Sequence, residues 1–261
     1  MDKLKLTSYI KDIELKNNMF KIIDKANSCL KNYDVKCSDF LNPFEVQNAI
    51  AILNYNDDLK YTVDGGYEES ERKVLFIYPF YMEYEDIEEN LRFIQIEGNF
   101  KFKSINHKDY LGSLLNLGIK REKIGDIIIH ESFCQVIVSN DICDFIVMNL
   151  EKVARNNVKI KEISREELVY NPPNYKEISF TVSSSRLDCI ISGLYNISRQ
   201  ESAKLINAEK VQVNYEKITS CSKEIKSGCM ISVRGKGRSQ IIDIGDLTKK
   251  GKIKVLGRLL V

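Results

Sequence analysis

The chain has 261 residues, about 1.7 times the length of a typical domain, so we expect two or three modules. Hydrophobic residues make up 43% and charged residues 29%, which excludes a wholly disordered or collagen-like chain. The total charge is only +2, but it is unevenly distributed: residues 1–100 carry a net −7, residues 101–177 a net +1 and residues 178–261 a net +8. This asymmetry indicates that the last third meets a polyanion, and a solvated basic face without a partner is the alternative.

The seven cysteines match neither a disulfide framework nor a zinc motif, because they include no Cys-x-x-Cys pair and only two histidines accompany them. We therefore expect a reducing, cytoplasmic location, no metal, no cofactor and no small-molecule substrate. The N-terminal sequence lacks the apolar core of a signal peptide. The longest apolar run, Val74–Met82, is interrupted by Pro79 and is far shorter than the roughly 20 residues that span a membrane, so no membrane partner is expected.

Residues 1–90 are predicted to form a small mixed α/β module. Apolar residues three or four positions apart within residues 3–31 predict a helix. Asn42, Pro43 and Glu45 have the types expected at the cap, the first position and the capping-box acid of a second helix, which runs to about residue 53. Two strands joined by a glycine turn follow, at Leu59–Val63 and Lys73–Tyr78 with the turn Asp64-Gly65-Gly66.

Residues 91–170 are predicted to form a ferredoxin-like β-α-β-β-α-β domain, which is also the skeleton of the RNA-recognition motif. Its expected elements are Arg92–Ile96, His107–Leu117, Asp126–His130, Gln135–Ser139, Ile142–Arg155 and Val158–Ile163. RNA-recognition motifs stack bases on aromatic residues of their first and third strands, and the predicted third strand contains none. We therefore expect a packing domain here, with Arg121 and Lys123 as secondary RNA contacts.

The segment Asn171-Pro172-Pro173-Asn174 predicts the main domain boundary, because proline restricts its predecessor and cannot donate a backbone hydrogen bond. Beyond it, residues 178–261 predict two short helices, each with a capping-box signature, packed on a small curled sheet of three strand-like segments. Basic residues stand at the element boundaries, around Gly235 and Gly237. Glycines let a backbone approach a phosphate and arginines match phosphate oxygens, so RNA is the expected ligand. The predicted contacts are Arg186, Arg199, Lys204, Lys210, Asn214, Arg234, Lys236 and Arg238.

Four ordered blocks in this last part resemble an S-four domain, the RNA-binding fold named after a small-subunit ribosomal protein: Ser185–Asp188, Ser198–Ile206, Val211–Asn214 and Ile231–Arg238. Upstream blocks at residues 40–43, 65–67, 71–72 and 111–127 resemble the YlmH family of bacterial RNA-binding proteins, so the match covers nearly the whole chain. Glu209 stands where that family usually has glycine. The resemblance implies a non-enzymatic protein that binds structured rRNA or tRNA on the large ribosomal subunit and rescues subunits blocked by peptidyl-tRNA.

An enzymatic role is the first alternative, because pseudouridine synthases with S-four domains use the aspartate of an Arg-Leu-Asp motif as nucleophile. Only 73 residues follow Asp188, too few for that catalytic domain, and an acid suits a helix start, so we expect no catalytic residue. The second alternative is a protein–protein adaptor, for example in cell division, to which family members have also been linked. Its acidic N-terminal module would dock a basic partner, and RNA binding would be incidental.

Overall fold

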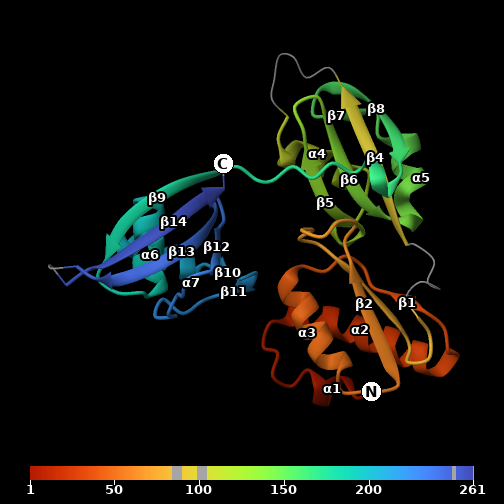
Figure 1. The fold of residues 1–261 in the computed structure, drawn as a ribbon, viewed down its shortest axis with the longest axis horizontal. Coiled ribbons are helices and arrows are strands. Elements are labelled where there is room, and N and C mark those ends of the chain that lie inside the picture. Colours follow the sequence, from red (N-terminus) through yellow and green to blue (C-terminus); the bar gives the residue numbers. More distant parts are fainter. Residues whose placement is uncertain (84–89, 99–104, 249–250, 261) are drawn as a thin grey trace. The chain divides into compact units, whose positions relative to one another are not determined.

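The computed structural model describes residues 1–83, 90–98, 105–248 and 251–260, and the chain forms two compact units, Met1–Asn171 and Pro172–Val261 (Figure 1). The division falls within the proline segment that the sequence singled out. The first unit contains two sheets. Its further division at residue 90 stays a prediction, because residues on both sides of that position share a core.

The N-terminal part of the first unit combines three helices with a three-stranded antiparallel sheet of order β1-β3-β2. The elements are α1 (Lys3–Leu6), α2 (Ile13–Asn32), β1 (Lys36–Cys37), α3 (Pro43–Leu53), β2 (Leu59–Asp64) and β3 (Val74–Pro79).

Local signals account for the helix ends in this part. The predicted capping box of α3 is confirmed: the Asn42 side chain accepts from the Glu45 backbone N–H at 3.0 Å, and Glu45 accepts from the Asn42 N–H at 2.8 Å. The single helix predicted over residues 3–31 is wrong at its start. A separate cap, Asp12, accepts from the Leu15 N–H at 2.8 Å and begins α2.

The link between β2 and β3 is longer than the predicted glycine turn, since Asp64 pairs with Val74 across the ladder. Of the two glycines, Gly66 alone has a positive φ, of 95°. Gly65 is needed for space instead, because a Cβ there would lie 2.3 Å from the Ser70 hydroxyl oxygen.

The second part of the first unit has the predicted ferredoxin-like order, with antiparallel strands arranged β5-β6-β4-β8-β7. Its elements are β4 (Leu91–Gly98), α4 (His107–Asn116), the 3-10 turn η2 (Arg121–Lys123), β5 (Ile124–Ile129), β6 (Phe133–Ser139), α5 (Asn140–Asn149), β7 (Lys152–Val153), β8 (Asn156–Ile163) and η3 (Arg165–Glu167).

Several predicted boundaries in this part differ from the structure, most of them by one or two residues, and two of the differences have consequences. The helix expected to reach Arg155 ends at Asn149, because Lys152–Val153 forms a hairpin with β8 around Ala154, which has a φ of 54°. Strand β6 starts at Phe133 rather than Gln135, so the third strand of the ferredoxin-like order does contain an aromatic residue.

The two faces of the ferredoxin-like sheet are covered by different partners. Ile94 and Val136 belong to the core that includes residues of α4 and α5. Residues of the opposite parity, such as Phe93 and Ile137, lie in a second core with Phe76 of β3. One half of the face on which an RNA-recognition motif stacks bases is therefore buried under the N-terminal sheet.

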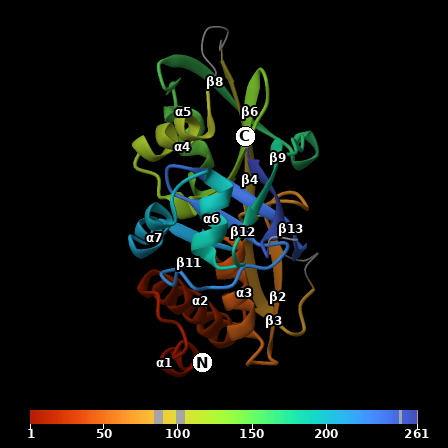
Figure 2. The same cartoon turned by 90° about the vertical axis from the view of Figure 1, so that its left-hand side faces the viewer.

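The second unit consists of two helices on a six-stranded antiparallel sheet of order β11-β10-β12-β13-β14-β9. Figure 2 shows α6 and α7 on one face of this sheet. The elements are β9 (Tyr175–Val182), α6 (Leu187–Tyr195), α7 (Arg199–Asn207), β10 (Val211–Val213), β11 (Glu216–Lys217), β12 (Met230–Val233), β13 (Gly237–Leu247) and β14 (Ile253–Leu260).

This sheet is larger than the three predicted segments, because β9 and β14 add two long strands at one edge. Helix α6 lies so close to β9 that a Cβ at Gly193 would be 2.1 Å from the Phe180 ring. Glu209 has a φ of 55°, a conformation that glycine adopts most easily, which gives a physical reason for the glycine of the resembled family at this position.

Candidate nucleic-acid interface

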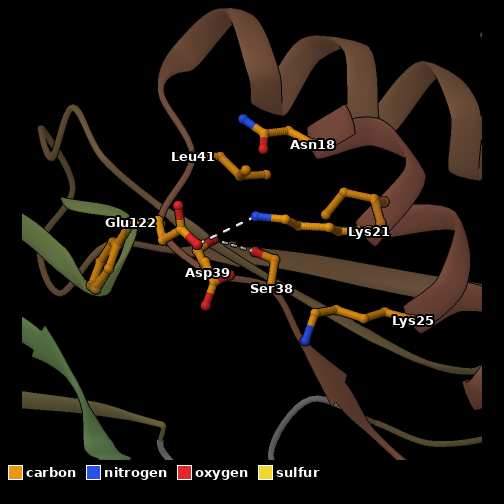
Figure 3. A pocket seen from close by; sticks show the side chains of 9 residues that line it. Asn18, Lys21, Lys25, Ser38, Asp39, Leu41 and Glu122 are labelled. Atoms are coloured by element: carbon orange, nitrogen blue, oxygen red, sulfur yellow. Dashed lines mark hydrogen bonds and ion pairs between the residues drawn. The ribbon is translucent and has the colours of Figure 1, made fainter. Parts of the chain in front are cut away.

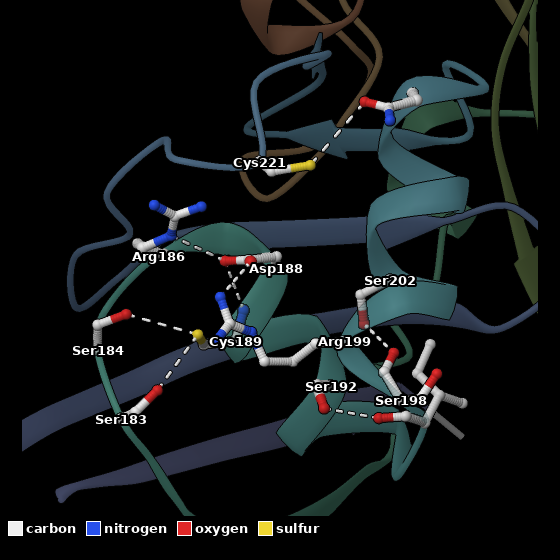
Figure 4. A network of polar contacts seen from close by, with 12 residues as sticks. Ser183, Ser184, Arg186, Asp188, Cys189, Ser192, Ser198, Arg199, Ser202 and Cys221 are labelled. Atoms are coloured by element: carbon white, nitrogen blue, oxygen red, sulfur yellow. Dashed lines mark hydrogen bonds and ion pairs between the residues drawn. The ribbon is translucent and has the colours of Figure 1, made fainter.

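Two of the predicted RNA contacts, Arg186 and Arg199, are held together by one carboxylate. Arg186 occupies the N-cap position of α6 without a side-chain capping hydrogen bond, and its Nε donates to Asp188 Oδ1 at 3.1 Å. Arg199, the first residue of α7, donates from Nη2 to Asp188 Oδ2 at 2.7 Å, and Figure 4 shows both guanidinium groups at this aspartate. The Asp188 side chain is only 7% exposed, whereas that of Arg199 is 56% exposed. The buried acid therefore fixes two arginines that still reach solvent.

The electrostatics of Asp188 follow from this pairing. Burial by itself would raise the pKa of Asp188, but the hydrogen bonds from Arg199 and Arg186 outweigh it and lower the pKa. The carboxylate is therefore ionised at neutral pH. Both of its oxygens are engaged, and Oδ1 also accepts from the Cys189 N–H at 3.0 Å, so Asp188 has a structural use at the start of α6.

Four more predicted residues lie on α7, between α7 and β10, and in the turn between β12 and β13. Lys236 lies 3.5 Å from Glu201 in the first turn of α7. The Arg234 N–H donates to the Lys210 carbonyl at 2.9 Å, which places these two residues side by side. Lys204 is exposed on α7, and neither it nor Lys210 nor Arg234 has an ion-pair partner among the described residues. We call this set the basic band: Arg186, Arg199, Lys204, Lys210, Arg234 and Lys236.

The turn within the basic band is open to a ligand. Gly235 and Gly237 have φ values of 85° and 101°, and no heavy atom lies within 4 Å of a Cβ built at either position. The backbone of this turn is therefore accessible from outside, as the approach of a phosphate requires.

The remaining two C-terminal predictions do not join the basic band. Arg238 lies on the sheet face opposite the helices, since the next residue, Ser239, is 1% exposed and points toward α6. Its guanidinium lies 5.6 Å from the Tyr215 ring centroid. Asn214 has a structural use: its side-chain oxygen accepts from the Met230 N–H at 2.8 Å across the β10–β12 pair.

The two secondary contacts, Arg121 and Lys123, are occupied within the first unit. Arg121 Nη1 donates to the carbonyls of Ile124 and Gly125, and burial lowers the pKa of Arg121 to about 10. Lys123 lies 3.1 Å from Asp39 and 2.8 Å from Asp141. These contacts fix the η2 turn and give both cations partners within the protein, and their role as secondary RNA contacts stays a prediction.

Glu122, between these two residues, is also tied down. It pairs with Lys21 of α2 at 3.3 Å beside a cavity of about 30 Å³, shown in Figure 3. A cavity of this size holds about one water molecule and no larger ligand. The whole turn therefore joins the two parts of the first unit.

Sequence reasoning missed the role of Asp188 as the common partner of two arginines. The spacing of Arg186 and Asp188 indicates that these two side chains can meet. The second arginine, Arg199, belongs to a different helix, so the sequence gives no local signal for its contact with Asp188. Among the described residues, no group of three or more His, Cys, Asp or Glu side chains is placed to hold a metal, and no helix there is long and apolar enough to cross a bilayer. All seven cysteines are free.

Comparisons with known proteins agree on one family. The family described as "Putative RNA-binding domain in YlmH" matches residues 84–167, and the one described as "YlmH, N-terminal" matches residues 14–82. "Ribosome-associated protein quality control protein P2" of Bacillus subtilis (strain 168) is 33% identical over 225 residues, which are 86% of this chain and 87% of that protein. The structure of "Cell division protein ylmH from Streptococcus pneumoniae" is similar in fold, with a TM-score of 0.50 and 24% identity over 61% of this chain and 96% of that one.

Proposed function

The chain belongs to the YlmH family, and from this premise we propose that it is a non-enzymatic, ribosome-associated RNA-binding protein. Its ligand is structured rRNA or tRNA on the large ribosomal subunit, and its process is ribosome-associated quality control in the cytoplasm. The name of the Bacillus subtilis relative and the description of the family matched by residues 84–167 support this proposal.

The observation that carries the proposal is the basic band. It combines exposed cations with an open glycine turn on the second unit, which acts as the S-four domain that the sequence blocks resemble. Binding comes mainly from neutralising phosphates and releasing condensed counterions. The logarithm of affinity should therefore fall with the logarithm of salt concentration by about 0.9 per contacted phosphate on duplex RNA, taking the duplex DNA value as a guide, and about 0.7 on single strands.

The test replaces the four residues of the basic band that do not pair with Asp188: Lys204→Ala, Lys210→Ala, Arg234→Ala and Lys236→Ala. Arg186 and Arg199 are kept because they pair with the buried Asp188, and Arg238 is kept because it faces the other side of the sheet. The control carries the same loss of charge in the N-terminal part, at Lys5, Lys11, Lys16 and Lys31, which have no ion-pair partner among the described residues.

We expect the quadruple variant to bind a fluorescent RNA hairpin roughly 100-fold more weakly at moderate salt, with the salt slope reduced by about 3. The control should bind like the wild type, and circular dichroism should show both variants folded. Unchanged affinity and slope in the folded quadruple variant would rule out the basic band as the RNA site.

A second candidate function, protein binding by the N-terminal part, rests on a separate hollow of about 460 Å³. Phe80 and Tyr81 on its wall are 54% and 57% exposed, and Asp58 adds an acidic group. This chemistry fits a basic peptide with an apolar side chain. A Phe80→Ser, Tyr81→Ser variant tests it: reduced sedimentation with purified large subunits at unchanged hairpin affinity would favour the adaptor role, and unchanged sedimentation would remove it.

A further inference from the structure

The face of the ferredoxin-like sheet that the N-terminal sheet partly covers has a second half, which the described residues of the first unit leave exposed and which we call the uncovered half. The border runs near Gln135, whose side chain donates to the Glu167 carbonyl at 2.9 Å and accepts from the Val169 N–H at 2.8 Å. On one side of this border Phe93 and Ile137 are buried in the shared core. On the other side the same face continues through Glu97, which is exposed.

Three lysines share this uncovered half. Lys159 lies opposite Glu97 and Lys161 lies opposite Gln95 in the β4–β8 ladder, so both point to the same face. Lys152 of β7 pairs with Asn157, which has the same parity as Lys159. All three lysines are exposed.

The charge of this half is positive. Glu97 is the one carboxylate that these strands place on it, and it pairs with Lys161 at 3.5 Å. Lys152 and Lys159 have no ion-pair partner among the described residues. The situation differs from that of Lys123, which two carboxylates neutralise.

An aromatic pair borders the lysines. Phe133 at the start of β6 lies opposite Glu97, on the same face, and its ring stacks on that of His130 with 4.3 Å between centroids and 25° between planes. Both side chains are half-buried, so the stack is fixed and one part of it still meets solvent.

From this arrangement we propose a second RNA-binding surface, formed by Lys152, Lys159, Lys161 and Phe133, that holds a single-stranded RNA segment. The lysines bind successive phosphates, and Phe133 offers its ring to a base. Lysines in a row beside an aromatic side chain are the combination with which sheets bind single strands. The inference rests on the proposed function and deepens it: residues 84–167 match a family described as a putative RNA-binding domain, and the inference names the face, the residues and the single-stranded class of RNA.

The strands of the uncovered half fit RNA better than a protein. Their exposed side chains are three lysines, one glutamate and a polar amide, and the exposed apolar residues nearest to them, Val169 and Tyr170, lie beyond Gln135 at the border. It is also a different binding mode from that of an RNA-recognition motif, because the half that carries Phe93 is closed by the N-terminal sheet.

The experiment uses the full chain and two fluorescent RNAs, a hairpin alone and the same hairpin with a single-stranded uridine extension. Two variants are compared with wild type: the triple Lys152→Ala, Lys159→Ala, Lys161→Ala and the single Phe133→Leu. The control triple carries alanine at Lys5, Lys11 and Lys31, with the same loss of charge. Circular dichroism shows whether each variant is folded.

We expect the extension to strengthen wild-type binding about tenfold and the lysine triple to lose that gain, with its salt slope on the extended RNA reduced by about 2. Phe133→Leu should lose about fivefold on the extended RNA alone, since a base loses its stacking partner. An extension that adds nothing to wild-type binding, or a folded triple that keeps the gain, would overturn the inference.

The hairpin alone separates this inference from the proposed function. Substitutions in the basic band should weaken the hairpin itself, whereas the lysine triple should leave it unchanged. Equal weakening of both RNAs by the lysine triple and by its control would indicate a general charge effect and would also contradict the inference.

Discussion

The η2 turn and the basic band both concentrate arginine and lysine, but the structure uses them in opposite ways. In the turn, Arg121 donates to two backbone carbonyls, and Lys123 pairs with two aspartates. In the basic band, Lys204, Lys210 and Arg234 are exposed and have no ion-pair partner among the described residues. The comparison separates cations that are neutralised within the protein from cations that remain available to a ligand.

After the quadruple variant, the largest expected effect is on the stability of the first unit and comes from replacing Asp126. This residue holds the loop that precedes β3. It accepts from the Tyr67 hydroxyl at 2.9 Å and from the backbone N–H groups of Glu71 and Arg72 at 2.7 and 3.1 Å. Asp126→Ala leaves three donors unpaired, so we expect the first unit to lose about 3 kcal/mol of unfolding free energy. Urea unfolding measures this, and an unchanged midpoint would contradict it. Affinity for the RNA hairpin should not change.

An intermediate effect is expected at Asp188, where the basic band also contains a structural pair. Asp188→Asn should cost the second unit roughly 2 kcal/mol at pH 7, because it removes a buried charge that two arginines face. Since the pKa of Asp188 is lowered on folding, its contribution is present above the unfolded value of about 3.9 and is lost as pH falls through the folded pKa. As pH falls from 5 to below the folded pKa of Asp188, the wild type should therefore lose more unfolding free energy than the asparagine variant does. Parallel pH profiles of the two proteins would contradict this account.

The smallest effects come from a matched pair of single substitutions. Lys123→Ala should cost up to about 1 kcal/mol of stability, because its ion pairs are partly exposed, and it should change RNA affinity less than twofold. Arg234→Ala should do the reverse, with stability unchanged and hairpin affinity reduced about fivefold, and with a salt slope smaller by roughly 0.9. Thermal unfolding and a binding titration on both variants would show it. The opposite pattern would reverse the roles assigned to the two clusters.

Much of the fold could be predicted from sequence because its signals are local. The capping box of Asn42 and Glu45 fixes the start of α3, and the alternation of helical and strand-like segments gave the ferredoxin-like order. The same alternation is present in β9, where Ile178, Phe180 and Val182 all face the core. The sequence therefore contains the signal for this strand, although the strand was not predicted.

Less of the candidate site could be predicted, because it depends on which side chains meet. Nothing near Lys123 in the sequence shows that Asp39 will neutralise it, and nothing near Phe93 shows that β3 will cover it. Arg238 has the right residue type for the basic band, but one step of strand parity turns it to the opposite face of the sheet. Contacts between distant segments decide these cases, and periodicity does not report them.

The core shared by the two sheets of the first unit has a practical consequence for dissecting this family. The two matched regions, residues 14–82 and 84–167, meet at a point where Phe76 and Tyr78 on one side pack against Phe93 and Ile163 on the other. A truncation at that junction would expose an apolar sheet face on each fragment, and such a face promotes aggregation and nonspecific binding. Each matched family region is thus not expected to be stable as a separate fragment. Truncated variants are better designed with their boundary at Asn171.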